Sequence, residues 1–283
     1  MELVKGVYLY TPPAEPRAPV VFEVPRSGRE YPPGFHSSAP FAAVHALTSM
    51  YVEEMWGLAP DAGCGLLFAT FSNNWIDANR ALDDIDPDLV DGWPEPVAPS
   101  AKSGRGMGLF HATVKGGFRL HDRKLTVAEA RDRIDNYWRP YHDRLAALIF
   151  AERRRAGVAF HLSCHSMTTI GPADFHDHGR RRKEFCLSDL DGATTDPDFM
   201  QAIADEIRRL GYGVTFNDPF KGNESIRRHA NPRGGVHSVQ IEMIRGMYYD
   251  EETFEKRPDF DRIRGDLGRI AGRIADYARS RAR

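Results

Sequence analysis

Short apolar segments alternate with amphipathic segments along most of the chain. Six of the apolar segments are rich in β-branched and aromatic residues and end at proline, glycine or polar residues, a pattern typical of buried strands. The predicted strands cover residues 19–24, 65–71, 109–114, 157–163, 211–216 and 237–244.

Helical spacing of apolar residues predicts four helices between and after these strands. Thr126 is followed three residues later by Glu129, a capping box that places a helix start there. Pro140 predicts a kink or a break within the same helix. The segments 25–40 and 92–108 are rich in proline and glycine and predict loops. The predicted helices cover residues 42–56, 126–152, 198–210 and 261–283, the last of them basic.

Strands that alternate with helices indicate βαβ units, so we predict an α/β fold with a mixed, mostly parallel central sheet flanked by helices. The chain of 283 residues is long enough to bury one large core. The loop at 92–108 is too short and too central to be a domain boundary. We therefore expect a single domain over residues 1–283.

Composition excludes several classes of function. The net charge is −2, with 38 basic and 40 acidic residues, which gives no reason to expect a nucleic-acid or membrane partner. No apolar run approaches the roughly 20 residues that span a bilayer, and the N-terminal residues do not resemble a signal peptide. The three cysteines are scattered and odd in number, so we expect free thiols in a cytoplasmic protein.

Polar residues follow several predicted strands, where an open α/β sheet binds its ligands. His165 closes the strand at 157–163 and is suited either to bind a metal or accept a proton, or to stiffen a turn. Glu242 lies inside the last strand, where an unpaired carboxylate would cost several kcal/mol. It either pairs with Arg245 or faces the cleft as a general base.

Asn79 and Arg80 follow the strand at 65–71, and Arg80 is suited to clamp a substrate carboxylate. Helix capping or surface exposure is the alternative for both residues. Two other patterns do not predict sites. The glycines at 104–108 precede a strand instead of a helix, which argues against a dinucleotide loop. His161 and His165 lie on a strand, about 13 Å apart, too far for one ion.

Several segments, in order, resemble the N-formylglutamate amidohydrolase family. These segments extend over roughly residues 18–278. Any single motif is weak evidence for the family, whereas the ordered set of motifs is specific to it. The matching segments are Pro25-Arg-Ser-Gly28, Asn73 to Arg80, Arg139-Pro-Tyr-His142, Cys164-His-Ser-Met167, Asp189-Leu-Asp-Gly192, Asn217 to Gly222 and Gln240 to Tyr248.

The resemblance implies a fold similar to that of zinc carboxypeptidases and hydrolysis of a linear amide, such as that of N-formylglutamate, by zinc-activated water. It makes His165 a metal ligand and Glu242 the general base. It implies that Asn79, Arg80 and Arg245 bind carboxylates or oxyanions of a small-molecule substrate. We add Arg26 and Asn217 as further candidate substrate-binding residues.

The chain departs from the family pattern at the metal site. Arg26 stands where the family has its first metal-binding histidine, and a guanidinium cannot bind zinc. Thr48-Ser49 replaces an acidic pair, Ser163 replaces an aspartate, and Asn73 replaces an arginine. The differences affect the metal site, whereas the residues expected to bind carboxylates persist.

Three hypotheses follow. In the first, the chain is a hydrolase whose zinc is held by His165 with His36 and His45 as substitutes, because a zinc site needs at least three protein ligands. In the second, the protein binds a small carboxylate without metal, and Arg26 supplies the positive charge. In the third, the basic C-terminal helix at 261–283 makes the chain an interaction module.

Overall fold

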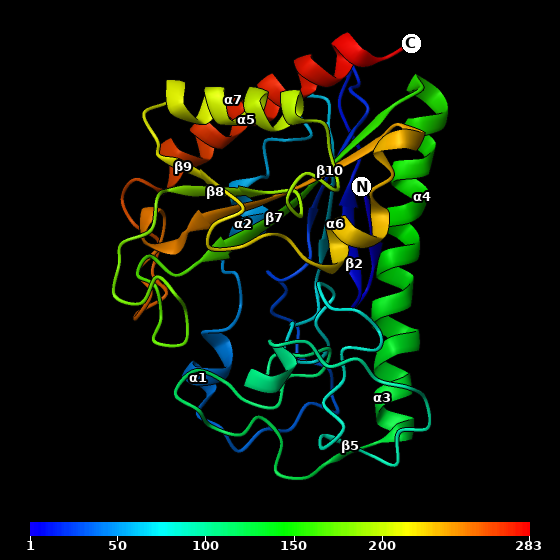
Figure 1. The fold of residues 1–283 in the computed structure, drawn as a ribbon, viewed down its shortest axis with the longest axis vertical. Coiled ribbons are helices and arrows are strands. Elements are labelled where there is room, and N and C mark those ends of the chain that lie inside the picture. Colours follow the sequence, from blue (N-terminus) through cyan, green and yellow to red (C-terminus); the bar gives the residue numbers. More distant parts are fainter.

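A mixed sheet of eight strands runs through the protein, which a computed structural model describes over residues 1–283. The four central strands are parallel, and antiparallel pairings flank them on both sides (Figure 1). This confirms the predicted α/β class with a mixed central sheet. In spatial order the strands are β1 (Glu2–Val4), β2 (Tyr8–Thr11), β4 (Gly65–Ala69), β3 (Val20–Val24), β7 (Ala159–Met167), β10 (Val236–Ile244), β8 (Phe185–Ser188) and β9 (Val214–Phe216).

Helices cover both faces of this sheet. One face packs against α2 (Val52–Met55), α5 (Pro197–Arg209) and α7 (Phe260–Arg281), and Figure 1 shows α5 and α7 running side by side above it. The opposite face is covered by α4 (Arg139–Ala156) and α6 (Glu224–His229). A loop-rich part of the molecule contains α1 (Phe41–His45), from the segment between β3 and β4. It also contains β5 (Val90–Asp91), β6 (Leu125–Thr126) and α3 (Val127–Arg133), from the segment between β4 and α4.

The two faces of the sheet differ in chemistry because side chains alternate along each strand. Phe22, Leu162 and Ile241 lie in the larger apolar core beneath α5 and α7. The residues next to them in sequence point the other way and are polar. This polar face consists of Glu23 on β3, His161, Ser163 and His165 on β7, and Ser238, Gln240 and Glu242 on β10, all less than 9% exposed.

Two predicted elements are wrong. Residues 109–114 form isolated bridges instead of a strand, because the backbone of Leu109 bonds to Asp77 and Asp84 in a neighbouring loop. The predicted helix 42–56 is divided into α1 and α2. The Ser49 N–H donates to the Arg26 carbonyl at 2.9 Å, and Tyr51 adopts the left-handed region at φ 62°, which ends any continuous helix.

The predicted helix at 126–152 begins as expected and is then interrupted. Thr126 and Glu129 form the capping box, each side chain accepting a backbone N–H of the other residue. A π-helical turn at Ile134–Trp138 separates α3 from α4, and Pro140 lies in the first turn of α4, where its missing N–H is tolerated. β1, β2, β8 and α6 were not predicted.

The three cysteines, Cys64, Cys164 and Cys186, are buried free thiols, as the sequence predicts. None of the helices combines the length and the apolar character that crossing a membrane requires.

Candidate functional site

His165 and Glu242 are neighbours across two adjacent parallel strands. They are register partners in the β7–β10 pairing, so both side chains project from the polar face. Both lie near the carboxyl ends of their strands, where open α/β sheets bind ligands. His161 faces the same way but lies four residues further back along the strand, opposite Ser238. The structure therefore brings the predicted imidazole and carboxyl group together.

Glu242 is a buried carboxyl group with few hydrogen-bond partners. Its hydrogen bond comes from Gln240 Nε2 at 2.9 Å, and 6% of the residue is exposed. Burial raises the pKa of Glu242, while the nearby cations Lys102, Arg26 and Arg245 act to lower it. A carboxyl group whose pKa is raised towards neutrality is suited to accept and return a proton.

Lys102 is the cation that acts most strongly to lower the pKa of Glu242, and no sequence signal predicts it as a site residue. It lies in the loop at 92–108, outside any regular element or recognisable motif. Burial lowers the pKa of Lys102, with Arg80 and Arg26 acting in the same direction and Glu242 acting against them. The charges of Lys102 and Glu242 thus affect each other's pKa, although no ion pair within 4 Å joins them.

His165 is enclosed by polar neighbours. Its Nε2 lies 2.9 Å from Ser163 Oγ and 3.3 Å from Asn79 Nδ2. Burial, and then the positive charge of Arg26, lowers the pKa of His165 to about 3, so the imidazole is neutral near pH 7. Asn79 in turn accepts the backbone N–H of Ser225 on α6 at 3.0 Å, which fixes its side chain above the polar face.

Arg26 lies at the centre of a charged cluster. Its Nε is 3.4 Å from a carboxylate oxygen of Asp77, and the same oxygen lies 3.1 Å from His111 Nε2. Burial alone would raise the pKa of Asp77, but Arg26 and Arg80 outweigh it and hold that pKa well below its usual range. Asp77 and His111 were not predicted as site residues. The Asp-x-Asn-Arg motif contains Asp77, whereas no sequence signal points to His111.

Arg80 is 2% exposed and binds mainly to backbone. Its Nε donates to the Met107 carbonyl and its Nη1 to the Asn79 carbonyl, both at 2.8 Å. Nη2 lies 3.8 Å from Asp77. These contacts fix the loop that carries Asp77 and Asn79, and two of the donors expected to clamp a substrate carboxylate are already used.

Arg245 does not form the direct ion pair with Glu242 that the sequence left open. Its Nη1 donates to the Ala46 carbonyl at 3.1 Å, and its Nε to Ser166 Oγ at 3.3 Å. Asn217 holds a turn in the left-handed region, at φ 52°, where its Nδ2 donates to Asp189 at 2.8 Å. Both side chains are therefore at least partly engaged within the protein.

The two substitute metal ligands lie apart from His165. His45 contacts Tyr31, with its Nδ1 3.1 Å from the phenolic oxygen, and stacks on Phe41. His36 lines a different pocket. No three histidine, cysteine or acidic side chains are placed so that they would hold one metal ion. The residues present therefore do not fit the zinc site that the family resemblance implies.

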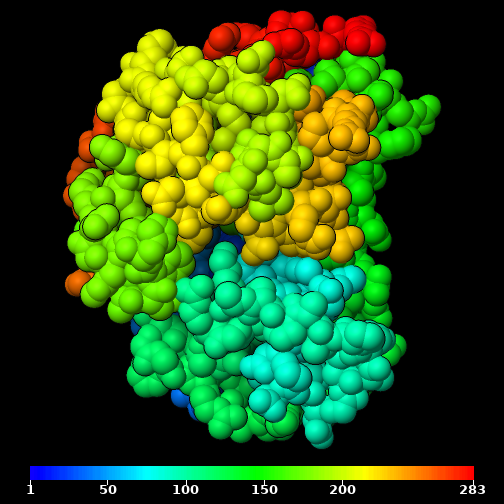
Figure 2. Space-filling model, in the orientation of Figure 1, coloured from blue at the N-terminus to red at the C-terminus, as the bar shows by residue number.

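A pocket of about 410 Å³ opens beside this cluster, and Lys102 belongs to its wall. Figure 2 shows the surface hollowed where the segment around residue 100 faces the segment around residue 220. The wall is basic and aromatic, and the Lys102 ammonium lies 5.5 Å from the centre of the Phe220 ring. The lining residues are Lys102, Arg105, Asp174, Phe175, His176, Pro219, Phe220, Lys221 and Gly222.

A buried carboxyl group and several cations at the carboxyl ends of parallel strands are suited to the proton transfer and charge stabilisation of a hydrolase, and known proteins agree with this class. The sequence profile of the N-formylglutamate amidohydrolase family matches residues 18–249. The chain is 29% identical over 218 residues to the N-formylglutamate deformylase of Pseudomonas putida, which covers 75% of this chain and 74% of the relative.

Solved structures show similarity to the same family. A crystal structure of N-formylglutamate amidohydrolase from Ralstonia eutropha JMP134 is 35% identical, with a TM-score of 0.91, and the match covers 97% of this chain and 99% of the other. A gene product of Agrobacterium tumefaciens, 20% identical with a TM-score of 0.67 over 96% and 95% of the two chains, shares the fold. The chain belongs to the N-formylglutamate amidohydrolase family, whose members are hydrolases that act on amide bonds.

Proposed function

We propose that this protein hydrolyses the linear amide of a small, carboxylate-bearing N-acyl amino acid, such as N-formylglutamate. The observation that carries the proposal is the position of Glu242, a buried carboxyl group beside His165 that receives one hydrogen bond and faces Lys102 and Arg26. The names of the relatives from Pseudomonas putida and Ralstonia eutropha support the substrate class.

In this proposal Glu242 removes a proton from water as the water oxygen attacks the amide carbon. The charge that develops on the carbonyl oxygen is stabilised by Arg26 and Lys102, which already lie near Glu242. The C–N bond then breaks, and the proton passes from Glu242 to the departing amine. The products are a carboxylic acid, formate for an N-formyl substrate, and the free amino acid.

His165 and Asn79 have positioning roles in this scheme. The imidazole is neutral, and its Nε2 contacts the Ser163 hydroxyl and the Asn79 amide, so it is suited to orient a polar group of the substrate. Arg105 and Lys221, in the wall of the 410 Å³ pocket, are suited to bind the substrate carboxylates. Arg245 and Asn217 contribute through the loops that they hold.

No step of this scheme uses zinc, because the residues present do not provide its ligands. Arg26, which stands in place of the first metal-binding histidine, supplies a fixed positive charge instead. The charge acts strongly at this position, since Arg26 is the cation with the largest effect on both Asp77 and His165.

The direct test is to incubate the purified chain with N-formyl-L-glutamate, N-acetyl-L-glutamate and N-formyl-L-leucine and to measure release of the free amino group. Metal content is measured on the same sample by mass spectrometry. We expect turnover of an N-acyl glutamate at far less than one metal ion per chain. Release of no amino acid from any of the three substrates would contradict the proposal.

A second candidate function is binding of a small carboxylate without catalysis. It is favoured by the ion pair between Arg26 and Asp77, which places a paired cation where the family resemblance implies a metal ligand. This candidate predicts saturable binding of glutamate or N-formylglutamate by calorimetry, with no amino acid released. Measuring amino-acid release by the purified protein therefore distinguishes the two candidate functions.

A further inference from the structure

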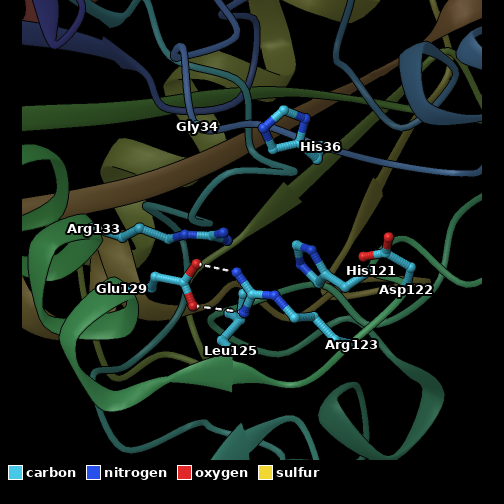
Figure 3. A pocket seen from close by; sticks show the side chains of 8 residues that line it. All are labelled: Gly34, His36, His121, Asp122, Arg123, Leu125, Glu129 and Arg133. Atoms are coloured by element: carbon cyan, nitrogen blue, oxygen red, sulfur yellow. Dashed lines mark hydrogen bonds and ion pairs between the residues drawn. The ribbon is translucent and has the colours of Figure 1, made fainter.

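A second, smaller pocket of about 160 Å³ lies on the loop-rich part of the protein. Figure 3 shows its lining, which contains a single apolar residue, Leu125. Two of its residues, Glu129 and Arg133, come from α3, and three others come from the segment just before β6. The lining residues are Gly34, His36, His121, Asp122, Arg123, Leu125, Glu129 and Arg133.

Arg133 is a buried cation without a counter-charge. It is 3% exposed, and no carboxylate oxygen lies within the 4 Å that defines an ion pair. One guanidinium nitrogen, Nη1, donates to the Trp75 carbonyl at 3.0 Å, and the group stacks 3.8 Å from the centre of the Trp75 ring. Its Nε is buried without a hydrogen-bond partner. A buried charge of this kind is costly unless something pairs with it.

His121 presents a second unpartnered polar group to the same pocket. The residue is 6% exposed, and its Nε2 is buried without a hydrogen-bond partner. Figure 3 shows its ring lying between the side chains of Arg133 and Asp122. Burial, and then the charges of Arg133 and His111, lowers the pKa of His121, while Asp122 and Glu129 act to raise it. The imidazole is therefore neutral near pH 7 and has an N–H to donate.

The acidic residues of the lining do not neutralise Arg133. Glu129 accepts two hydrogen bonds from Arg123, at 2.9 and 2.6 Å, and further bonds from Thr126. In Figure 3 the Asp122 carboxylate lies on the far side of the His121 ring from the Arg133 guanidinium. The pocket thus has one internally neutralised pair, Arg123 with Glu129, and one unpaired cation.

We propose that this pocket binds a small oxyanion, with inorganic phosphate as the representative ligand. The anion pairs with the Arg133 guanidinium and accepts a hydrogen bond from the His121 imidazole. The pocket volume suits an ion of this size and leaves no room for a large ligand. This site is separate from the Glu242 cleft, and the inference does not depend on the catalytic proposal.

The test is calorimetric titration of the full-length protein with inorganic phosphate. We expect one saturable site in the wild type and binding at least about tenfold weaker in R133Q, because charge-assisted hydrogen bonds are the strong ones. The matched control is R131Q, on the same helix, since Arg131 is exposed and pairs with Glu95 outside the pocket. Binding that is equal in R133Q and the wild type would overturn the proposal.

Two further variants keep the test informative if R133Q fails to fold. H121N should weaken phosphate binding several-fold, and R133K should bind phosphate more weakly than the wild type, because lysine lacks the planar fork. K102M reports on the Glu242 cleft, which is also basic. Phosphate binding that survives in H121N and R133K but disappears in K102M would place the anion in that cleft and overturn the inference.

Discussion

The two faces of the central sheet are equally buried but hold different kinds of side chain. On the face beneath α5 and α7, residues such as Leu162 and Ile241 are enclosed by apolar neighbours, and each contributes about 1.5–3 kcal/mol by its burial. On the opposite face, one residue along each strand, Ser163 and Glu242 are polar and need hydrogen bonds to offset their burial. One strand thus supplies stability on one side and chemistry on the other.

The two ends of the polar face differ in how completely their buried carboxyl groups are hydrogen-bonded. We call the end at Glu23 the satisfied end and the end at Glu242 the open end. At the satisfied end, Glu23 pairs with His161 at 3.2 Å and accepts a hydrogen bond from Ser225 at 3.1 Å. Burial would raise the pKa of Glu23, but His161, with smaller contributions from His142 and Ser163, lowers it to about 2. At the open end, near the carboxyl ends of the strands, Glu242 has one hydrogen bond and a raised pKa. The incompletely paired group is the one positioned to react.

The largest expected effect comes from E242Q, which preserves shape and the contact with Gln240 but removes the base. We expect the rate of amide hydrolysis to fall by about 10²–10⁴-fold. The control is I241V, the adjacent residue on the apolar face, which should lose about 0.5–1.5 kcal/mol of stability and no activity per folded molecule. Steady-state kinetics and urea unfolding on both variants check this, and equal activity in E242Q and the wild type would refute it.

L162A tests the apolar face directly. Leu162 is fully buried in the larger core, so truncation leaves a cavity and should cost about 2–5 kcal/mol of the free energy of unfolding. S163A, one residue along on the polar face, should change stability much less and should alter the site through its contact with His165. Urea unfolding curves measure both. A larger stability loss in S163A than in L162A would reverse the assignment of the faces.

The pH dependence of stability tests the buried imidazoles. His165 and His121 have pKa values lowered by burial to about 3 and about 4. Below pH 6.5, therefore, these two histidines bind protons in the unfolded chain but remain neutral in the folded protein until the pH approaches their lowered pKa values. Each histidine then costs about 1.4 kcal/mol of unfolding free energy per pH unit. The raised pKa of Glu242 has the opposite sign and offsets part of this loss.

We accordingly expect stability to decline between pH 6.5 and pH 4.5 and the decline to be shallower in H165Q. Urea unfolding at several pH values provides the measurement. A stability that is constant over this range, or a slope unchanged in H165Q, would contradict the environment described for this imidazole.

K102M has the most specific expected effect, a shift of the pH–rate profile that accompanies the loss of rate from removing a cation that stabilises the carbonyl oxygen. Lys102 acts to lower the pKa of Glu242, so its removal should raise that pKa and move the acidic limb of the pH–rate profile to higher pH. K124M, an exposed lysine in the turn before β6, is the control and should leave the profile unchanged. A shift of the acidic limb to lower pH would mean that Lys102 does not act on Glu242.

The sequence predicted the sheet better than the loops. Residues 157–163 and 237–244 have apolar and polar positions in alternation, and both became central strands. Strand 109–114 failed because Leu109 and Phe110 are buried by a loop whose backbone hydrogen bonds connect segments distant in sequence. Helix 42–56 failed because a hydrogen bond from Ser49 to Arg26 depends on tertiary position, which local spacing does not encode.

The sequence predicted those site residues whose side-chain direction is fixed by a strand. His165 and Glu242 meet because their strands are in register, and both were identified from the sequence. Lys102 and His111 come from irregular segments, so their approach to Glu242 and Asp77 depends on the whole fold. His36 and His45 follow Arg26 closely in sequence, which made them candidate substitute metal ligands, but they do not group with His165 around one metal position.

The claim that most needs testing is that Arg26 supplies the positive charge at the site in place of a metal. The measurement is kcat/KM for N-formyl-L-glutamate before and after exhaustive dialysis against a chelator, with zinc then added back. We expect the same kcat/KM in all three samples, within about twofold. Loss of activity on chelation and its recovery with zinc would contradict it.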